Sequence, residues 1–230
     1  MVEPVTVPEL DAKPFTHSRL YDLAAATPLM VVYGFASVGN VILISGQWSR
    51  IGEWSIQLSV ASKIATSLFF GLQIVLCLLR RLPLKKSEGL WPRATAILGA
   101  NSNFVLLLLP QATLGLDWTT ISATLTIAGT VGSLAILFFL GRSFSIFPEA
   151  RSLVTEGPYR YIRHPLYLAE LISTLGIMLQ FRQPWAALVV AATLAFQLRR
   201  MGHEEGVLRR TFADYDGYAK RTARLIPGLY

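Results

Sequence analysis

Two short segments in the last third of the chain carry the residues whose types and spacing could do chemistry. Residues 157–167 have the sequence GPYRYIRHPLY, and residues 199–205 have the sequence RRMGHEE. In the first segment Pro165 suits the first turn of a helix, where its missing backbone donor costs nothing. His164 would then stand at a helix N-terminus, whose free N–H groups and partial positive charge can hold a carboxylate or the edge of an adenine.

The second segment places charged residues at helical spacing. Arg200 and Glu204 are four residues apart, as are Arg199 and His203, so each pair shares one face of a helix. One of these pairs can point inward. A structural interpretation of both segments remains open. In the first segment the tyrosines would form an interfacial aromatic belt and the arginines would be anchors. In the second segment an amphipathic helix would lie against the headgroups and carry solvated ion pairs.

Long apolar runs precede and separate these segments. The chain is 53% hydrophobic and 15% charged, whereas soluble domains carry about 25% charged residues. Four runs have the length of a membrane-spanning helix, and two shorter ones, separated by Arg182 and Gln183, are typical of a tight helical hairpin. The runs cover residues 23–46, 56–79, 94–116, 119–140, 166–181 and 184–198.

We therefore predict an all-α integral membrane protein with about six hydrophobic helices, the last two a short hairpin. A cytosolic amphipathic helix is expected after them, built on apolar residues at helical spacing in the tail. The expected division is a cytosolic segment over 1–22, a four-helix transmembrane region over 23–140 and a catalytic, cofactor-binding region over 141–230. The tail residues that carry the spacing are Leu208, Phe212, Tyr215 and Ala219.

The placement of basic residues predicts the orientation. Lys13 and Arg19 precede the first run, five Lys and Arg residues link the second and third runs, and seven lie in the tail after the hairpin. The alternate links carry Arg50, none and Arg182. By the positive-inside rule both termini and both chemistry-bearing segments face the cytoplasm. The formal charge of +7 is explained by this orientation, so nucleic acid is not an expected partner.

Several other classes of site are disfavoured. The single cysteine, Cys77, excludes an internal disulfide and a cysteine-rich metal cluster. The three histidines, His17, His164 and His203, have no acidic partner at ligand spacing, so no metal site is predicted. No GxGxxG motif follows a predicted strand, and the first 22 residues lack the basic start and apolar core of a cleavable signal peptide.

Four polar residues interrupt the long runs: Asn40, Lys63, Asn101 and Asn103. Such groups are costly in a bilayer and can line a substrate cavity. The favoured interpretation is structural, with the asparagines bonding between helices and Lys63 reaching toward the interface.

The order of these features resembles one known family. A GPYRYIRHPLY segment, a short hairpin, a Glu-Glu pair directly after it and a tail with Tyr, Arg and Pro are similar to the isoprenylcysteine carboxyl methyltransferase family, whose wider relatives include membrane phospholipid methyltransferases. The resemblance covers about 90 of the 230 residues. It implies a membrane methyltransferase that uses S-adenosylmethionine and acts on a lipophilic or prenylated acceptor, most simply by carboxyl O-methylation of an isoprenylcysteine-like substrate.

The resemblance also implies residue roles. Glu204 would contact S-adenosylmethionine, with Glu205 as the near substitute, and Arg200 would serve the substrate carboxylate. This chain has Ala169 where the family often has Gly. The remaining residues implied in cofactor contacts are Leu153, Val154, Tyr159, His164, Pro165, Leu166 and Tyr167.

Alternatives remain open from the sequence. A carboxylate acceptor is already a nucleophile, whereas an amine or a thiol would need a base such as His203, Glu205 or a tyrosine. Membrane sterol-type reductases, which use NADPH, share an Arg-His-Pro-x-Tyr segment but generally have Asn where this chain has Leu166. A non-enzymatic transporter or scaffold is the third alternative. The oligomeric state cannot be read from the residues.

Overall fold

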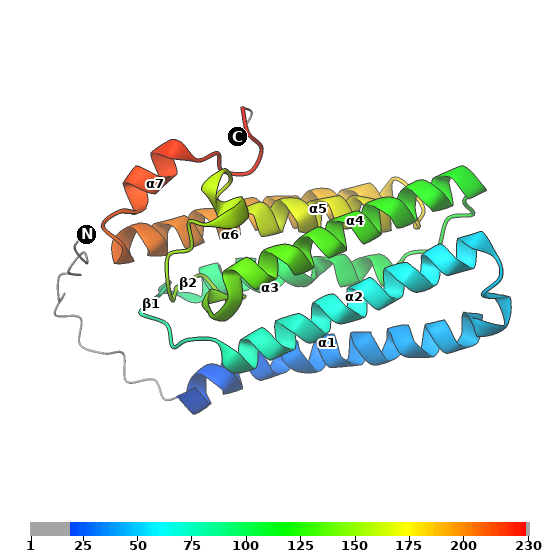
Figure 1. Cartoon of the computed structure of the whole chain (residues 1–230), viewed down its shortest axis with the longest axis horizontal. Coiled ribbons are helices and arrows are strands. Elements are labelled where there is room, and N and C mark those ends of the chain that lie inside the picture. Colours follow the sequence, from blue (N-terminus) through cyan, green and yellow to red (C-terminus); the bar gives the residue numbers. More distant parts are fainter. Residues whose placement is uncertain (1–18, 229–230) are drawn as a thin grey trace, which may run out of the picture.

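The chain folds into long helices that lie side by side along one direction (Figure 1). The computed structural model describes residues 19–228, so Lys13, His17 and most of the predicted segment 1–22 lie outside the described residues. The α-helices are α1 (Arg19–Gln47), α2 (Trp54–Leu79), α3 (Leu90–Asn101), α4 (Leu116–Leu140), α5 (Pro165–Met178), α6 (Trp185–Thr211) and α7 (Tyr215–Arg221). Two short strands, β1 (Lys85–Lys86) and β2 (Glu149–Ala150), pair antiparallel.

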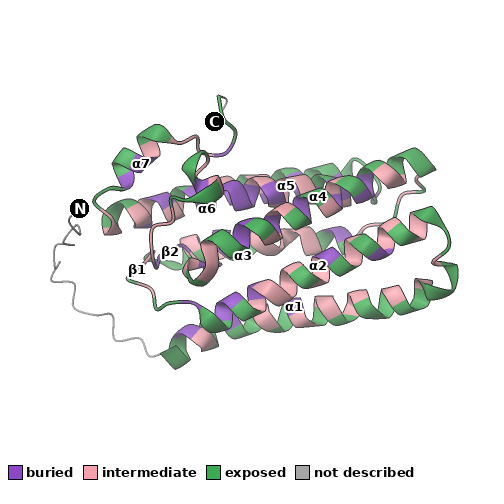
Figure 2. Cartoon of the chain, viewed as in Figure 1, coloured by how far each residue is buried: buried purple, intermediate pink, exposed green. Residues whose placement is uncertain are grey.

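Three helical segments among the described residues are long and apolar enough to cross a membrane: Arg19–Arg50, Trp54–Leu79 and Leu116–Ser143. Many of their large apolar side chains are exposed, including those of Phe35 and Phe138. Figure 2 shows the buried positions concentrated in α4, α5 and α6, while α1 and α2 carry mostly exposed and intermediate positions. This confirms an all-α membrane protein, although the predicted count of six hydrophobic helices is not established by these spans.

The third predicted run, 94–116, is not one helix. The α-helix α3 ends at Asn101, and a 3-10 helix, η2 (Ser102–Leu108), follows it. The polar groups here bond to neighbouring helices, because Asn103 Nδ2 donates to Thr174 Oγ1 at 2.8 Å and the Ser102 hydroxyl lies 2.8 Å from that of Thr193. Pro110 then prevents continuation, since it lacks a backbone donor. The sequence prediction of a continuous span was therefore wrong.

The predicted hairpin is present, but its second arm is longer than expected. α5 and α6 are joined by a short turn, and α6 continues for 27 residues, or about 40 Å at 1.5 Å per residue. It passes through residues 199–211, which were predicted to start a separate amphipathic helix. Arg, Met, Glu and Leu favour helix and no proline interrupts them, so α6 extends beyond the apolar run and ends at Thr211. The short α7 follows at an angle to α6 (Figure 1).

Helices α4 and α5 pack most extensively, and two glycines allow their close approach. A Cβ atom built on Gly129 would lie 2.3 Å from Ser173 N and 2.6 Å from Ala169 O. One built on Gly176 would lie 2.6 Å from Ser122 O and from Thr126 N. These obstructing atoms are mostly backbone, so a side chain at either position would force the helices apart. The approach sets the position of α5, whose N-terminal end carries His164.

We therefore expect Gly129→Ala to destabilise the protein by at least about 2 kcal/mol, as overpacking a tight contact does. The measurement is the thermal unfolding midpoint in detergent. The control is Gly71→Ala on α2, where no atom lies within 4 Å of the added Cβ, and which should leave the midpoint unchanged or raise it slightly because alanine favours helix. Equal midpoints for the two variants would contradict this packing.

The polar residues inside the long runs have structural partners. Asn40 Nδ2 on α1 donates to Ser67 Oγ on α2 at 3.2 Å, and Lys63 Nζ donates to Gln47 Oε1 at 3.3 Å near the far end of the same pair of helices. Asn101 Nδ2 donates to Ile97 O within its own helix at 2.9 Å. The interhelical interpretation is thus confirmed for Asn40 and Asn103.

The start of α1, the end of α2, the β1–β2 pair, the start of α5, the end of α6 and α7 lie at one end of the molecule (Figure 1). This end gathers the basic links that follow α2 and α4 and the basic tail. The two chemistry-bearing segments, far apart in sequence, are brought together here. The assignment of this end of the molecule to the cytoplasmic side stays a prediction, as does the domain boundary at residue 141.

Candidate active site

A pocket of about 110 Å³ lies at this end of the helices, between the segment after α4, the start of α5 and the last turns of α6. Eight of the ten residues predicted to bind or act line it. These are Leu153, Val154, Tyr159, His164, Leu166, Tyr167, Arg200 and Glu204. The other two, Pro165 and Glu205, lie beside the pocket without lining it.

The start of α5 positions the aromatic part of the pocket. A 3-10 turn, η4 (Gly157–Arg160), begins at Gly157, whose φ of +58° is accessible to glycine at little cost. His164 is the residue before α5, and Pro165 is its first residue, as predicted. The His164 and Tyr167 rings stack with centroids 5.4 Å apart and an interplanar angle of 6°. Two nearly parallel aromatic faces are thereby held at the helix N-terminus.

The last part of α6 positions the charged side of the pocket. Arg200 Nε donates to Glu204 Oε1 at 3.0 Å, and the Tyr167 hydroxyl donates to the same oxygen. The Arg200 guanidinium lies 4.7 Å from the centre of the Tyr167 ring, a cation–π contact. Arg200 is buried, whereas its neighbour Arg199 is exposed. Of the two helical pairs, the Arg200/Glu204 pair therefore faces the pocket.

Glu205 joins three segments instead of lining the pocket. Its Oε1 accepts from Arg163 Nε at 3.0 Å, from Arg224 Nε at 3.1 Å, and lies 3.1 Å from His164 Nε2. Backbone bonds continue this junction, with Arg163 N donating to Ala223 O at 2.9 Å. Burial raises the pKa of Glu205, but the hydrogen bonds from His164 and Arg163 and the charge of Arg224 outweigh it and hold the pKa at about 2.

This depressed pKa has a consequence for the docking of the tail. A carboxylate whose folded pKa lies below its unfolded value stabilises the fold fully above about pH 4.5 and loses that contribution as the pH falls toward 2. Glu205→Gln mimics the protonated form at neutral pH. We expect it to speed hydrogen exchange at the Ala223 and Arg163 amides by about tenfold or more, because it removes a charge-assisted anchor. In the unaltered chain the same acceleration should appear on acidification from pH 4.5 to 2, after correction for intrinsic exchange.

Asp216→Asn is the matched control for Glu205→Gln. Asp216 is also an acid near the tail, but its pair with Arg209, at 2.6 Å, is solvent-exposed, and such pairs contribute little. Exchange at the same amides should change by less than about twofold. If exchange at these amides were as slow in Glu205→Gln as in the unaltered protein, the tail would be held without this carboxylate.

Several residues at the site escaped prediction. Tyr215 and Tyr218 of α7 line the pocket, and Tyr218 Oη donates to Tyr159 O at 2.8 Å, which joins α7 to η4. Burial raises the pKa of Tyr218 to about 12, so its hydroxyl keeps its proton at neutral pH. Glu149 and Ser145 also line the pocket from the segment after α4.

Glu170, although not a lining residue, is a further group that the prediction missed. It lies on α5 near Arg200, and Gln197 Nε2 donates to its Oε2 at 3.3 Å. The available signal was that Glu170 is the single charged residue in the run 166–181, and an ionisable group inside an apolar run suggests a functional site.

The described residues hold no cluster of three or more His, Cys, Asp or Glu suited to a metal ion. What the pocket offers is a carboxylate, a buried guanidinium, aromatic faces and a lining of Leu and Val side chains. Such a set can pair with an ammonium group, stack on a heterocycle or a cationic sulfur centre, and orient an anionic acceptor.

Fold and site together define a helical membrane protein with a polar pocket at one end of its helices, and comparison with known proteins places it further. Residues 117–215 match the family described as phospholipid methyltransferase. The matched region contains nearly all of α4, the whole α5–α6 hairpin and every pocket-lining residue except Tyr218. Together with the methyltransferase relatives, this match confirms the resemblance to isoprenylcysteine-type membrane methyltransferases.

The individual relatives include a methyltransferase and two proteins named for metal resistance. The chain is 32% identical over 111 residues to protein-S-isoprenylcysteine O-methyltransferase B of Arabidopsis thaliana, covering 45% of this chain and 56% of that one. It is 33% identical over 122 residues to the nickel-cobalt-cadmium resistance protein NccN of Alcaligenes xylosoxydans xylosoxydans, covering 49% and 54%. The cobalt-zinc-cadmium resistance protein CzcN of Cupriavidus metallidurans is 34% identical over 106 residues, covering 44% of each chain. The chain spans about half the length of these curated relatives.

Proposed function

We propose that this protein is an integral membrane methyltransferase that uses S-adenosylmethionine. The observation that carries the proposal is the pocket itself, in which Glu204, Tyr167 and His164 converge with Leu153 and Val154. These residues come from the two segments whose motifs resemble the isoprenylcysteine carboxyl methyltransferases.

The residues present fit the chemistry of this cofactor. When bound, S-adenosylmethionine supplies a methyl group on a cationic sulfur and leaves as S-adenosylhomocysteine. The Glu204 carboxylate would pair with the amino group, and the face of Tyr159 would hold the sulfonium. Ligand pockets commonly enclose about 300–1,000 Å³, so this pocket of about 110 Å³ must widen on binding. Parting of the Glu204 side chain from Arg200 and Tyr167 is one movement that would do this.

The acceptor in this proposal is a lipophilic carboxylate, of the kind found on an isoprenylcysteine. Arg200 would hold the carboxylate by its planar fork of donors, and positioning is then sufficient because the acceptor already carries a nucleophilic oxygen. The exposed apolar faces of the helices support a pocket beside the bilayer, from which a prenyl chain would enter. Two of the relatives named above are metal-resistance proteins, and their names do not define an acceptor.

Calorimetry on the purified protein tests the cofactor. S-Adenosylhomocysteine is expected to bind, and NADPH is not. Binding of NADPH alone would reject the methyltransferase assignment in favour of a membrane reductase, and binding of neither would favour a transporter or scaffold.

The acceptor is tested separately with radiolabelled S-adenosylmethionine and membranes that contain the protein. A carboxyl methyl ester releases its label in mild base, whereas a methylated amine or thioether retains it. Base-stable label would keep the methyltransferase assignment and reject the carboxylate acceptor.

The proposal includes orientation and partners. The bilayer is the expected environment, both chain ends face the cytoplasm where S-adenosylmethionine is found, and the pocket end carries the basic links in accordance with the positive-inside rule.

A further inference from the structure

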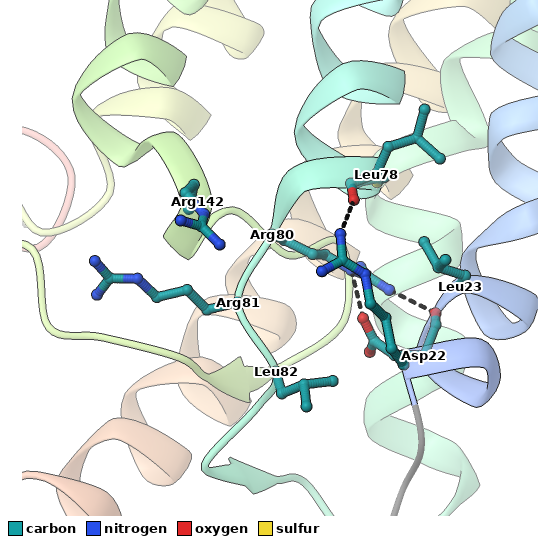
Figure 3. Close-up of a pocket in the computed structure, with 9 residues that line it drawn as sticks. Asp22, Leu23, Leu78, Arg80, Arg81, Leu82 and Arg142 are labelled. Atoms are coloured by element: carbon teal, nitrogen blue, oxygen red, sulfur yellow. Dashed lines mark hydrogen bonds and ion pairs between the residues drawn. The ribbon is translucent and has the colours of Figure 1, made fainter.

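A second pocket, of about 290 Å³, lies where α1 begins and α2 ends. Figure 3 shows its labelled residues, which come from the start of α1, the end of α2 and the segments that follow α2 and α4. None of its lining residues lines the candidate active site. The lining consists of Arg19, Asp22, Leu23, Cys77, Leu78, Arg80, Arg81, Leu82 and Arg142.

The lining is strongly basic. The lining contains four arginines and a single carboxylate, that of Asp22. Both oxygens of this carboxylate are already engaged, because Oδ2 accepts from Arg80 Nε at 2.8 Å and Oδ1 accepts from Arg151 Nη2 at 2.9 Å. Arg19 and Arg142 donate to neutral acceptors, the carbonyls of Leu78 and Leu79, at 3.0 Å each. The positive charge of the pocket therefore exceeds what the lining acid can balance.

Arg80 provides an independent sign that an anion is favoured here. Its side chain is 2% exposed, and two of its nitrogens are satisfied, since Nη2 donates to Asp22 O at 2.8 Å and Nε to the carboxylate. Its third nitrogen, Nη1, is buried without any hydrogen-bond partner among the described residues. A buried guanidinium donor left unpaired is costly, and an anionic oxygen is the acceptor that such a group binds best.

The surroundings indicate an amphiphilic ligand. The pocket lies at the ends of three segments able to span a membrane, Arg19–Arg50, Trp54–Leu79 and Leu116–Ser143. Leucine side chains complete the lining, and those of Leu78 and Leu82 are about half exposed. A basic pocket with an apolar edge at the end of membrane helices matches the headgroup and upper acyl chain of an anionic lipid.

We infer that this pocket binds the phosphate of an anionic phospholipid, held by the positive charges of Arg19, Arg80 and Arg142. The acyl chain then lies against Leu78 and Leu82. The site is separate from the proposed methyltransferase chemistry, so either assignment can fail without the other.

The test measures the thermal unfolding midpoint of the full-length chain in a neutral detergent. It is titrated with dioctanoyl phosphatidylglycerol, with dioctanoyl phosphatidylcholine and with inorganic phosphate. A ligand that binds the folded state raises the midpoint in a saturable way. We expect phosphatidylglycerol to do so at concentrations at least about tenfold below those needed for phosphatidylcholine, and inorganic phosphate at equal concentration to have no effect.

Two double variants locate the effect. Arg19→Gln with Arg142→Gln should raise the half-saturating concentration of phosphatidylglycerol by at least about tenfold. Arg80 is left in place because its removal would break the Asp22 ion pair. The control, Arg160→Gln with Arg221→Gln, removes the same charge from exposed positions at the same end of the molecule and should change it by less than about twofold.

Three results would overturn the inference. An equal response to phosphatidylcholine would show no selectivity for an anionic headgroup. An equal response to inorganic phosphate would make this a site for a soluble anion. An equal rise in the half-saturating concentration of phosphatidylglycerol in the two double variants would assign the effect to the general surface charge instead of the pocket.

Discussion

Glu204→Gln is expected to weaken binding of S-adenosylhomocysteine by about 30- to 100-fold. Glu204 is the acid of α6 that lines the pocket, and its Oε1 already accepts from Arg200 and Tyr167. In the proposed complex its carboxylate pairs with the amino group of the cofactor, and a charge-assisted bond of this kind is worth about 2–3 kcal/mol. Glutamine keeps the size and one carbonyl oxygen but removes the charge. Calorimetric titration of the purified variant measures the change.

Glu156→Gln is the matched control, because Glu156 is an exposed acid just before η4 at the same end of the molecule and outside the pocket lining. The affinity of the Glu156→Gln variant for S-adenosylhomocysteine should stay within about twofold of that of the unaltered protein. The thermal midpoints of both variants establish that they are folded. His164→Ala should also weaken binding, since it removes the ring stacked on Tyr167. Normal affinity in both Glu204→Gln and His164→Ala would show that the cofactor residues are wrongly assigned.

Arg200→Lys should reduce kcat/KM for a carboxylate acceptor by at least about a hundredfold while changing cofactor affinity by only a few-fold. Arg200 is buried, stacks on the Tyr167 ring and bonds Glu204 through Nε. Lysine retains the positive charge, so the nearby acids are not left unbalanced. It lacks the planar fork that can hold both carboxylate oxygens, and a small misplacement of an acceptor can cost about two orders of magnitude in rate.

Arg199→Lys provides the comparison at the adjacent position. Arg199 is exposed and does not line the pocket, so its conservative replacement should leave both kcat/KM and cofactor affinity within about twofold. The measurements are initial rates with a prenylated cysteine analogue and calorimetry with S-adenosylhomocysteine. If Arg200→Lys retained full activity, Arg200 would not be the residue that orients the acceptor.

Local patterns explain why much of the architecture could be predicted. The lengths of the apolar runs correctly indicated α1, α2 and α4, since a span depends on about 20 consecutive apolar residues. Pro165 marked the start of α5 because a proline is tolerated in the first helical turn. The spacing of Arg200 and Glu204 showed that they share a face of α6, which the structure confirms. Each of these signals lies within one element.

The failures have equally definite causes. The run 94–116 was apolar enough for a span, but α3 gives way to η2 at Ser102, where Ser102 and Asn103 bond to other helices, and Pro110 prevents η2 from continuing. The tail was separated from the hairpin because the apolar pattern changes at residue 199. Helix propensity does not change there, and α6 therefore continues to Thr211.

The segments at 157–167 and 199–205 were recognisable from the sequence, and so were the apolar helices that precede and separate them. Which charged groups meet was decided by tertiary packing. Glu205, next to Glu204, turns instead to Arg163 and Arg224. Arg80 meets Asp22 across 58 residues, and Arg151 meets it across 129. Helical periodicity relates residues three or four apart, whereas contacts over such separations depend on which helices pack together, so no local pattern could have revealed the second pocket.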